Sequence, residues 1–91
     1  MTRVIATLSV APDRKPELVA AAIPAIEATR AEDGCIAYDL YESITDPGKL
    51  VFVEEWDSAD RLAAHSSSDH MKAFGRVAVG CFTGKPEIQI I

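Results

Sequence analysis

The sequence predicts an α+β fold whose elements follow the order β-α-β-β-α-β, the split βαβ or ferredoxin-like pattern. Three observations lead to it: β-branched or alternating segments at both ends of the chain, a helical apolar pattern after the first and the third strand, and a turn signal between the two middle strands. In this pattern the first and third strands lie in the middle of the sheet and the other two at its edges. The 91 residues suffice for one small domain.

The first third of the chain predicts a strand followed by a long helix. Residues 3–10 are rich in β-branched side chains and end before Ala11-Pro12-Asp13, which is typical of a turn. From Pro16 onward the apolar spacing is helical, with Pro24 expected to bend the helix and Gly34 to end it with a positive φ. The predicted apolar stripe consists of Leu18, Val19, Ala22, Ile23 and Ile26.

A hairpin is predicted next. Residues 35–43 alternate in polarity, residues 45–48 supply a Thr-Asp-Pro-Gly turn, and residues 50–56 form the third strand. The chain then returns to helical spacing.

Serine and aspartate side chains indicate where the last helices begin. Asp57 or Ser58 can cap a helix that carries Leu62 and Ala63, and the serines at 66–68 can cap a further piece or mark a break between two short helices. The last strand is predicted from the alternation in 87–91.

Composition excludes several classes of partner. Nine Lys and Arg stand against fourteen Asp and Glu, and no basic cluster is interleaved with aromatic residues, so we expect no nucleic acid partner. No apolar stretch approaches the ~20 residues of a membrane helix, and we expect no membrane partner. Cys35 and Cys81 form no metal-ligand spacing and no secretory leader is evident, which predicts a cytoplasmic protein with two free thiols.

Two adjacent glutamates, Glu54 and Glu55, interrupt the apolar run of the third strand. Successive strand side chains point to opposite faces, so one carboxylate lies on each face of a central strand. The face of Glu54 also carries Leu50, Phe52 and Trp56, and the face of Glu55 carries Val51 and Val53.

Because the third strand is apolar on both faces, a monomer would leave one of them exposed. We therefore expect a homodimer whose two sheets pack face to face. Glu55 would then meet the partner sheet or pair with an arginine such as Arg3 or Arg61.

Four segments of the chain are recognisable together: TRAEDGCIAY at 29–38, FVEEWDS at 52–58, LAAH at 62–65 and DHMKAF at 69–74. They resemble the antibiotic biosynthesis monooxygenase family, and its quinol monooxygenase branch most closely. The resemblance implies that residues 1–91 form a single dimeric α+β barrel domain. It also implies that the protein is an enzyme that oxidises a small phenolic or quinol-type aromatic substrate with O₂ and uses no metal, haem or flavin cofactor.

His65 is the expected general base, because a neutral imidazole can accept a phenolic proton near pH 7. Glu54 would orient it, or bind the substrate hydroxyl. Since His65 and His70 would lie roughly 140° apart on a continuous helix, we expect no metal site. His70 is expected at the surface, and a helix break at the serines would leave its direction open. Glu32 is expected to serve the helix end and surface pairing. The residues expected to bind the aromatic ring are Trp56, Phe52, Tyr38, Phe74 and Met71.

Two other functions stay open. An isomerase or lyase of a small oxygenated metabolite could use the same histidine and glutamate without O₂. A non-enzymatic dimeric binding or stress-response module would instead fill the pocket with side chains. The chain contains no asparagine, the residue associated with the active site of haem-degrading relatives, and this counts against haem.

Overall fold

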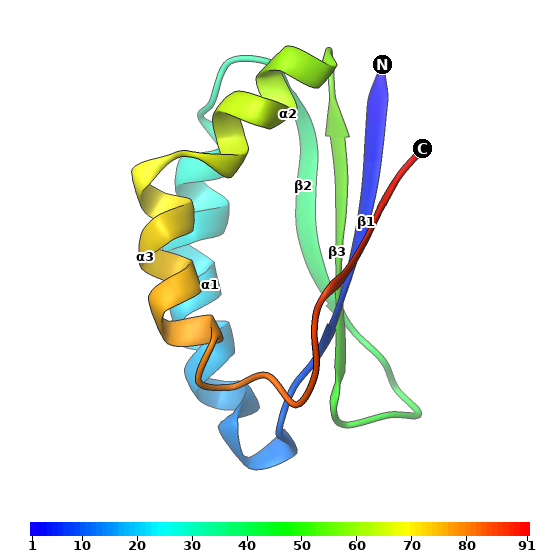
Figure 1. The fold of residues 1–91 in the computed structure, drawn as a ribbon, viewed down its shortest axis with the longest axis vertical. Coiled ribbons are helices and arrows are strands. Elements are labelled where there is room, and N and C mark those ends of the chain that lie inside the picture. Colours follow the sequence, from blue (N-terminus) through cyan, green and yellow to red (C-terminus); the bar gives the residue numbers. More distant parts are fainter.

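A four-stranded antiparallel sheet forms one layer of the structure, and the helices form the other (Figure 1). The computed structural model describes residues 1–91. The strand order is β2-β3-β1-β4, so the first and third strands are central, as predicted. The strands are β1 (Thr2–Ser9), β2 (Cys35–Glu42), β3 (Lys49–Trp56) and β4 (Glu87–Ile90).

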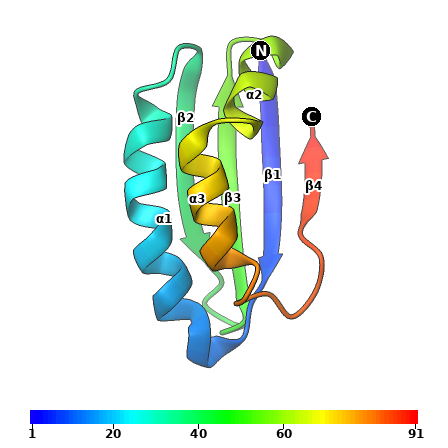
Figure 2. The same cartoon turned by 60° about the vertical axis from the view of Figure 1, so that its left-hand side comes forward.

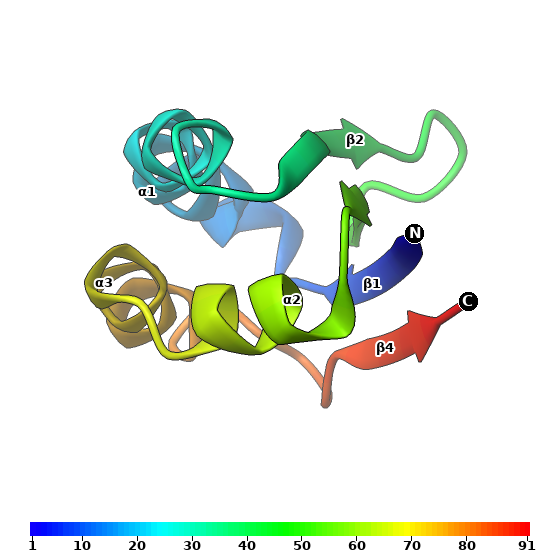
Figure 3. The ribbon, with the colours of Figure 1, turned by 90° about the horizontal axis from the view of Figure 1, so that it is seen from above.

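All the helices lie on the same face of the sheet (Figure 3). A short 3₁₀ turn, η1 (Pro12–Arg14), leads into α1 (Lys15–Arg30), and α2 (Ala59–Ser66) and α3 (Asp69–Ala78) follow β3. None of the helices is long and apolar enough to cross a membrane. The predicted break at the serine cluster is confirmed.

Serine side chains begin both short helices. Ser58 caps α2 by accepting a hydrogen bond from the backbone N–H of Arg61 at 3.3 Å, and Ser68 caps α3 by accepting one from Met71 at 3.4 Å. Between them the chain leaves the helical path, and α3 takes a new direction.

Helix α1 confirms part of the predicted apolar stripe, because Leu18 and Ala22 are buried and Ile26 packs against the core. Its buried residues have the spacing i, i+4, i+7 and i+11, whereas Ile23 is 54% exposed. Small side chains allow α1 to pack against both α3 and β2, and this close packing, rather than side-chain hydrophobicity, selects the face. The buried residues are Leu18, Ala22, Ala25 and Thr29.

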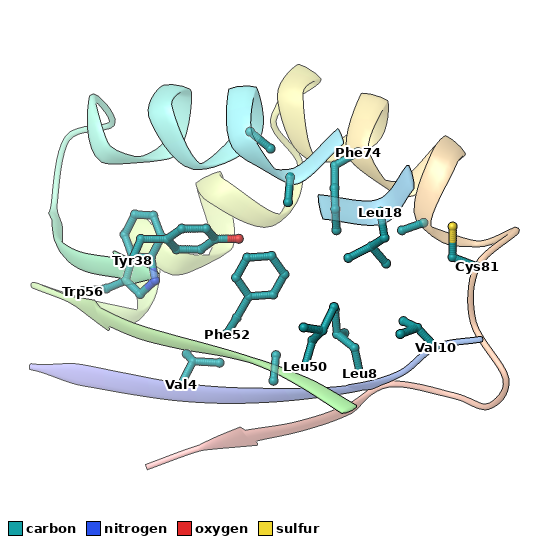
Figure 4. Close-up of a cluster of buried hydrophobic side chains, with 14 residues drawn as sticks. Val4, Leu8, Val10, Leu18, Tyr38, Leu50, Phe52, Trp56, Phe74 and Cys81 are labelled. Carbon is teal, nitrogen blue, oxygen red and sulfur yellow. The ribbon is translucent and has the colours of Figure 1, made fainter. Parts of the chain in front are cut away.

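The hydrophobic core fills the space between sheet and helices (Figure 4). From β1, Val4, Ala6 and Leu8 point into it, as the alternation predicts. Phe52 rises from β3 to meet Phe74 of α3, with the ring centroids 5.8 Å apart and the rings nearly perpendicular.

Gly34 fixes the position of the loop before β2. Its φ of 85° confirms the predicted left-handed helix stop, and a Cβ here would collide with the side chains of Arg61 and Asp57. The Gly34 carbonyl accepts a hydrogen bond from the Asp57 N–H at 2.9 Å. Residues just before β2 therefore lie beside those just after β3.

The face of the sheet away from the helices is uncovered in the single chain (Figures 1 and 3). Glu55 lies there and accepts a hydrogen bond from Arg3 at 2.8 Å, as predicted. Val53 is 43% exposed and Tyr41 55% exposed on the same side. Both cysteines are free thiols, also as predicted.

Candidate active site

A cavity of about 510 Å³ opens between the helical face of the sheet and the helices α2 and α3. Most of its wall is apolar, and it carries two titratable side chains with possible acid–base roles, Glu54 and His65. Its outer wall includes β4, which lies at the sheet edge with no helix above it (Figure 2). The isoleucines of that wall, Ile88 and Ile90, are exposed.

All the predicted site residues except Trp56 line this cavity. Figure 4 shows Tyr38, Phe52 and Phe74 reaching from β2, β3 and α3 into the layer between sheet and helices. Trp56 is completely buried and lies behind the cavity wall. The predicted residues on the wall are Tyr38, Phe52, Glu54, His65, Met71 and Phe74.

His65 is held rigidly at the end of α2. The residue is only 3% exposed, and its ring lies 4.8 Å from that of Trp56 and 5.2 Å from that of Tyr38, measured between centroids. Its Nδ1 lies 2.8 Å from Oε2 of Glu32. A carboxylate there favours a proton on Nδ1, which leaves Nε2 as the nitrogen that can accept one from a molecule in the cavity.

The partner of His65 is Glu32, and the expectation that Glu54 would orient the imidazole is wrong in this respect. Glu54 instead accepts a hydrogen bond from Nε1 of Trp56 at 3.0 Å. The two residues are two positions apart on β3, so they share a face and the indole reaches the carboxylate first.

Burial shifts the protonation of two cavity side chains. It raises the pKa of Glu54, against the opposing effects of the Trp56 hydrogen bond and of His65. Burial also raises the pKa of the Tyr38 hydroxyl, with further increases from the charges of Glu54 and Glu32. The Tyr38 hydroxyl, which lies 3.8 Å from the sulfur of Met71, therefore stays protonated near neutral pH.

Both histidines of the chain meet at one carboxylate oxygen. Nε2 of His70 lies 2.8 Å from Oε2 of Glu32, the same oxygen that His65 contacts. The prediction that the two histidines diverge was wrong because it assumed a continuous helix, and the break after α2 turns His70 back toward Glu32. Glu32 likewise serves this cluster rather than the helix end.

Comparison with known proteins places the chain in a family. Residues 1–77 match the family described as Antibiotic biosynthesis monooxygenase. The chain belongs to this family. The matched stretch contains every site residue from Glu32 to Phe74, whereas the β4 wall of the cavity lies beyond it.

Individual relatives and solved structures are also similar to this chain. The chain is 42% identical over 83 residues to a Mycobacterium tuberculosis protein named "Putative monooxygenase Rv0793", covering 91% of this chain and 80% of that one. It is 31% identical over 87 residues to the uncharacterized protein sll1783 of Synechocystis, covering 96% of this chain but only 59% of that protein's length. The crystal structure of a conserved protein from Methanosarcina mazei Go1 superposes with a TM-score of 0.95 at 33% identity, covering 99% of this chain and 89% of that one.

The contacts of Glu32 and His70 with one another and with His65 were not predicted from the sequence. Topology offered a signal for Glu32: Cys35 pairs with Trp56 in the β2–β3 hairpin, so a residue just before β2 must lie near the start of α2. For His70 the signal was the serine cluster, because a helix break there removes the fixed angle between the two histidines.

Proposed function

We propose that this family member is a homodimeric monooxygenase that oxidises a small phenolic or quinol-type aromatic substrate with O₂ and needs no cofactor for the reaction. The observation that carries the proposal is the buried pair of His65 and Glu32 at the wall of an apolar cavity. The monooxygenase character is supported by the family and by the names of its members.

The cavity suits a flat apolar ring with few polar groups. Its volume of about 510 Å³ falls within the range of ~300–1,000 Å³ typical of small-molecule sites. Phe52 and Phe74 supply aromatic faces, Met71 a polarizable sulfur, and Tyr38 a protonated hydroxyl. An open cavity also opposes the alternative of a binding module whose pocket is filled by side chains.

His65 would begin the reaction by accepting the phenolic proton on Nε2. The carboxylate of Glu32, hydrogen-bonded to Nδ1, stabilises the imidazolium that results. The electron-rich phenolate then gives an electron to O₂, and the two radicals combine at a ring carbon. The resulting peroxide anion takes the proton back from His65. The ring carbon, which carries a hydrogen atom, then loses that hydrogen as a proton together with hydroxide from the peroxide, and becomes a carbonyl. One oxygen atom thus enters the product, the other leaves as water, and the substrate supplies all the electrons.

The subunits would pair through the uncovered face of the sheet. Val53 and Tyr41 are exposed on this face, and the Arg3–Glu55 ion pair lies beside them. Packing two such faces together removes their apolar surface from water. The uncovered face supports the dimer, and the oligomeric state is measured by the light-scattering experiment described below.

Oxygen uptake tests the proposal directly. Metal-free protein is incubated with a panel of hydroquinones and dihydroxynaphthalenes, and uptake is compared with that of His65→Ala. Removing a general base costs typically 10²–10⁴-fold, so we expect uptake by the wild type and a loss of about that size in the variant. A folded wild type that consumes no O₂ with any substrate of the panel would overturn the oxygenase proposal for these substrates.

One observation favours a second function, an isomerase or lyase. Glu54 and His65 share the cavity wall, and burial raises the pKa of Glu54 and so favours its protonated form. An acid and a base on one wall can together move a proton between two carbon atoms of one substrate. Product formation in the absence of O₂ would support this function over the oxygenase.

A further inference from the structure

We propose that Glu32, His65 and His70 form a binding site for a divalent transition-metal ion, Zn²⁺ in particular, on the side of His65 that faces away from the cavity. One ligand atom from each residue lies within 4.8 Å of the other two. Two imidazoles and one carboxylate are a ligand set that suits Zn²⁺ and its neighbours in the first transition series.

Three separate segments hold these ligands in place. Glu32 sits in the α1–β2 connection, which is fixed by the conformation of Gly34 and its hydrogen bond to Asp57. His65 is clamped between aromatic rings, and His70 Nε2 lies 3.3 Å from Oγ of Ser68. The side chains are only 19%, 4% and 24% exposed, so little conformational entropy would be lost on binding.

The Glu32 carboxylate has no permanently charged cationic partner in the chain. No lysine or arginine forms an ion pair with this carboxylate, and its only positively chargeable partners are the two histidines. The neighbouring arginines are used elsewhere: Arg30 pairs with Asp39 and Arg61 with Asp33. A metal ion would supply a positive charge where neutral imidazoles do not.

The three ligand atoms would have to shift by about 0.5–1.5 Å to bind one ion. Zinc lies ~2.0–2.2 Å from nitrogen and oxygen ligands, so two tetrahedral ligands are about 3.3 Å apart. The two contacts of Glu32 Oε2 with the histidines, now 2.8 Å, would lengthen by about 0.5 Å. The two histidine nitrogens, which lie within 4.8 Å of each other, would approach by up to about 1.5 Å. These shifts would fall on the Glu32 and His70 side chains, which are less buried than His65, and solvent would complete the coordination.

Such an ion would also switch off the base. A neutral imidazole that binds a metal through Nδ1 carries its proton on Nε2, and that nitrogen can then no longer accept one from a substrate. Zinc is thus expected to inhibit catalysis from behind the cavity. This consequence rests on the proposed function, whereas the binding itself does not.

Isothermal titration calorimetry with ZnCl₂ tests the site. We expect one ion per chain for the wild type, an affinity lower by at least about 100-fold for His70→Ala, and unchanged binding for Cys35→Ser. The cysteine control matters because a thiolate is also a zinc ligand and Cys35 follows Glu32 closely in the chain. Circular dichroism melts establish that each variant is folded, and Glu32→Ala provides a second ligand-removing variant should His70→Ala not fold.

Two results would overturn the site: no zinc binding by the folded wild type, or equal binding by the wild type and a folded ligand variant. Binding lost in Cys35→Ser but kept in His70→Ala would do the same. With an active substrate in hand, Zn²⁺ should suppress O₂ uptake of the wild type and have little effect on that of His70→Ala. Zinc binding by a protein that shows no O₂ uptake in zinc-free buffer would refute the proposed function alone.

Discussion

The hydrogen bond between Trp56 and Glu54 should contribute to the free energy of unfolding, and the variants Trp56→Phe and Glu54→Gln test this contribution. The carboxylate is 7% exposed, and the indole N–H, 3.0 Å away, is its one hydrogen-bond donor within the chain. Phenylalanine keeps an aromatic ring in the buried site but removes that donor. Glutamine keeps an acceptor oxygen in place but removes the charge.

The magnitude follows from the state of the carboxyl group. A hydrogen bond to a charged group contributes ~1.5–3 kcal/mol, and a neutral one ~0.5–1.5 kcal/mol. Burial raises the folded-state pKa of Glu54 above its unfolded value, so the fold is more stable when this carboxyl group is protonated. The stability that protonation of Glu54 contributes is complete at low pH and is lost as the pH rises through the folded-state pKa. Because glutamine keeps a neutral acceptor for the indole N–H, the double-mutant cycle measures only the excess of the charged hydrogen bond over a neutral one. The coupling free energy should therefore be close to zero at a pH below the folded-state pKa of Glu54 and about 1 kcal/mol at a pH above it.

Urea denaturation of the wild type, the two single variants and the double variant gives the coupling free energy at each pH. The double-mutant cycle subtracts the packing lost when an indole becomes a phenyl ring. Trp56→Phe should lose stability more steeply than the wild type as the pH rises through the folded-state pKa of Glu54, and Glu54→Gln less steeply. A coupling below ~0.5 kcal/mol at a pH above that pKa, within the error of additivity, would refute the assignment of this bond as the support of a buried carboxylate.

Two further variants test the base and the dimer. Glu32→Gln replaces a charge-assisted hydrogen bond to His65 by a neutral one, which costs about 1–2 kcal/mol of transition-state stabilisation. The value of kcat/KM for O₂ uptake should therefore fall by roughly 5–30-fold. Unchanged kinetics would show that Glu32 does not assist His65 in catalysis. Val53→Asp places a charge on the uncovered face of the sheet and should convert a dimer to a monomer, as measured by light scattering. The control Ile44→Asp, in the fully exposed β2–β3 turn, should leave the dimer intact. A wild type that is monomeric at micromolar concentration would contradict the pairing of sheet faces.

The sheet and the order of elements could be predicted because alternation is a local signal. Val4, Ala6 and Leu8 each had to lie on one face, and the structure buries all three. Only part of the buried face of α1 could be found in the same way: Leu18 and Ala22 were predicted and are buried, whereas the burial of Ala25 was not predicted. Ile23 is more hydrophobic than Ala25, yet Ala25 is buried and Ile23 is not, because the helix approaches its neighbours along its smallest side chains.

The cavity wall was predictable for a similar reason, but the contact of His65 and His70 with Glu32 behind it was not. Phe52 and Glu54 share a strand face, which fixes them in one wall. Glu32 lies 33 positions from His65 and 38 from His70, and no periodicity relates them. Their meeting depends on the hairpin register, on the turn at Gly34 and on the helix break before Ser68, three features that must be combined to place one oxygen atom.

The separation of the two carboxylates bears on the choice between the proposed reactions. Glu32 touches the imidazole on the side opposite the cavity and has no place on the cavity wall, so it can stabilise charge on His65 but cannot exchange a proton with a substrate. Glu54 lies on the wall, and burial favours its protonated form. An oxygenase needs only the base and its carboxylate, because deprotonation is what makes the substrate reactive toward O₂. An isomerase needs in addition an acid that returns a proton, and Glu54 has the position for it. The carboxyl group of Glu54 is therefore the feature of this site that distinguishes the two chemistries.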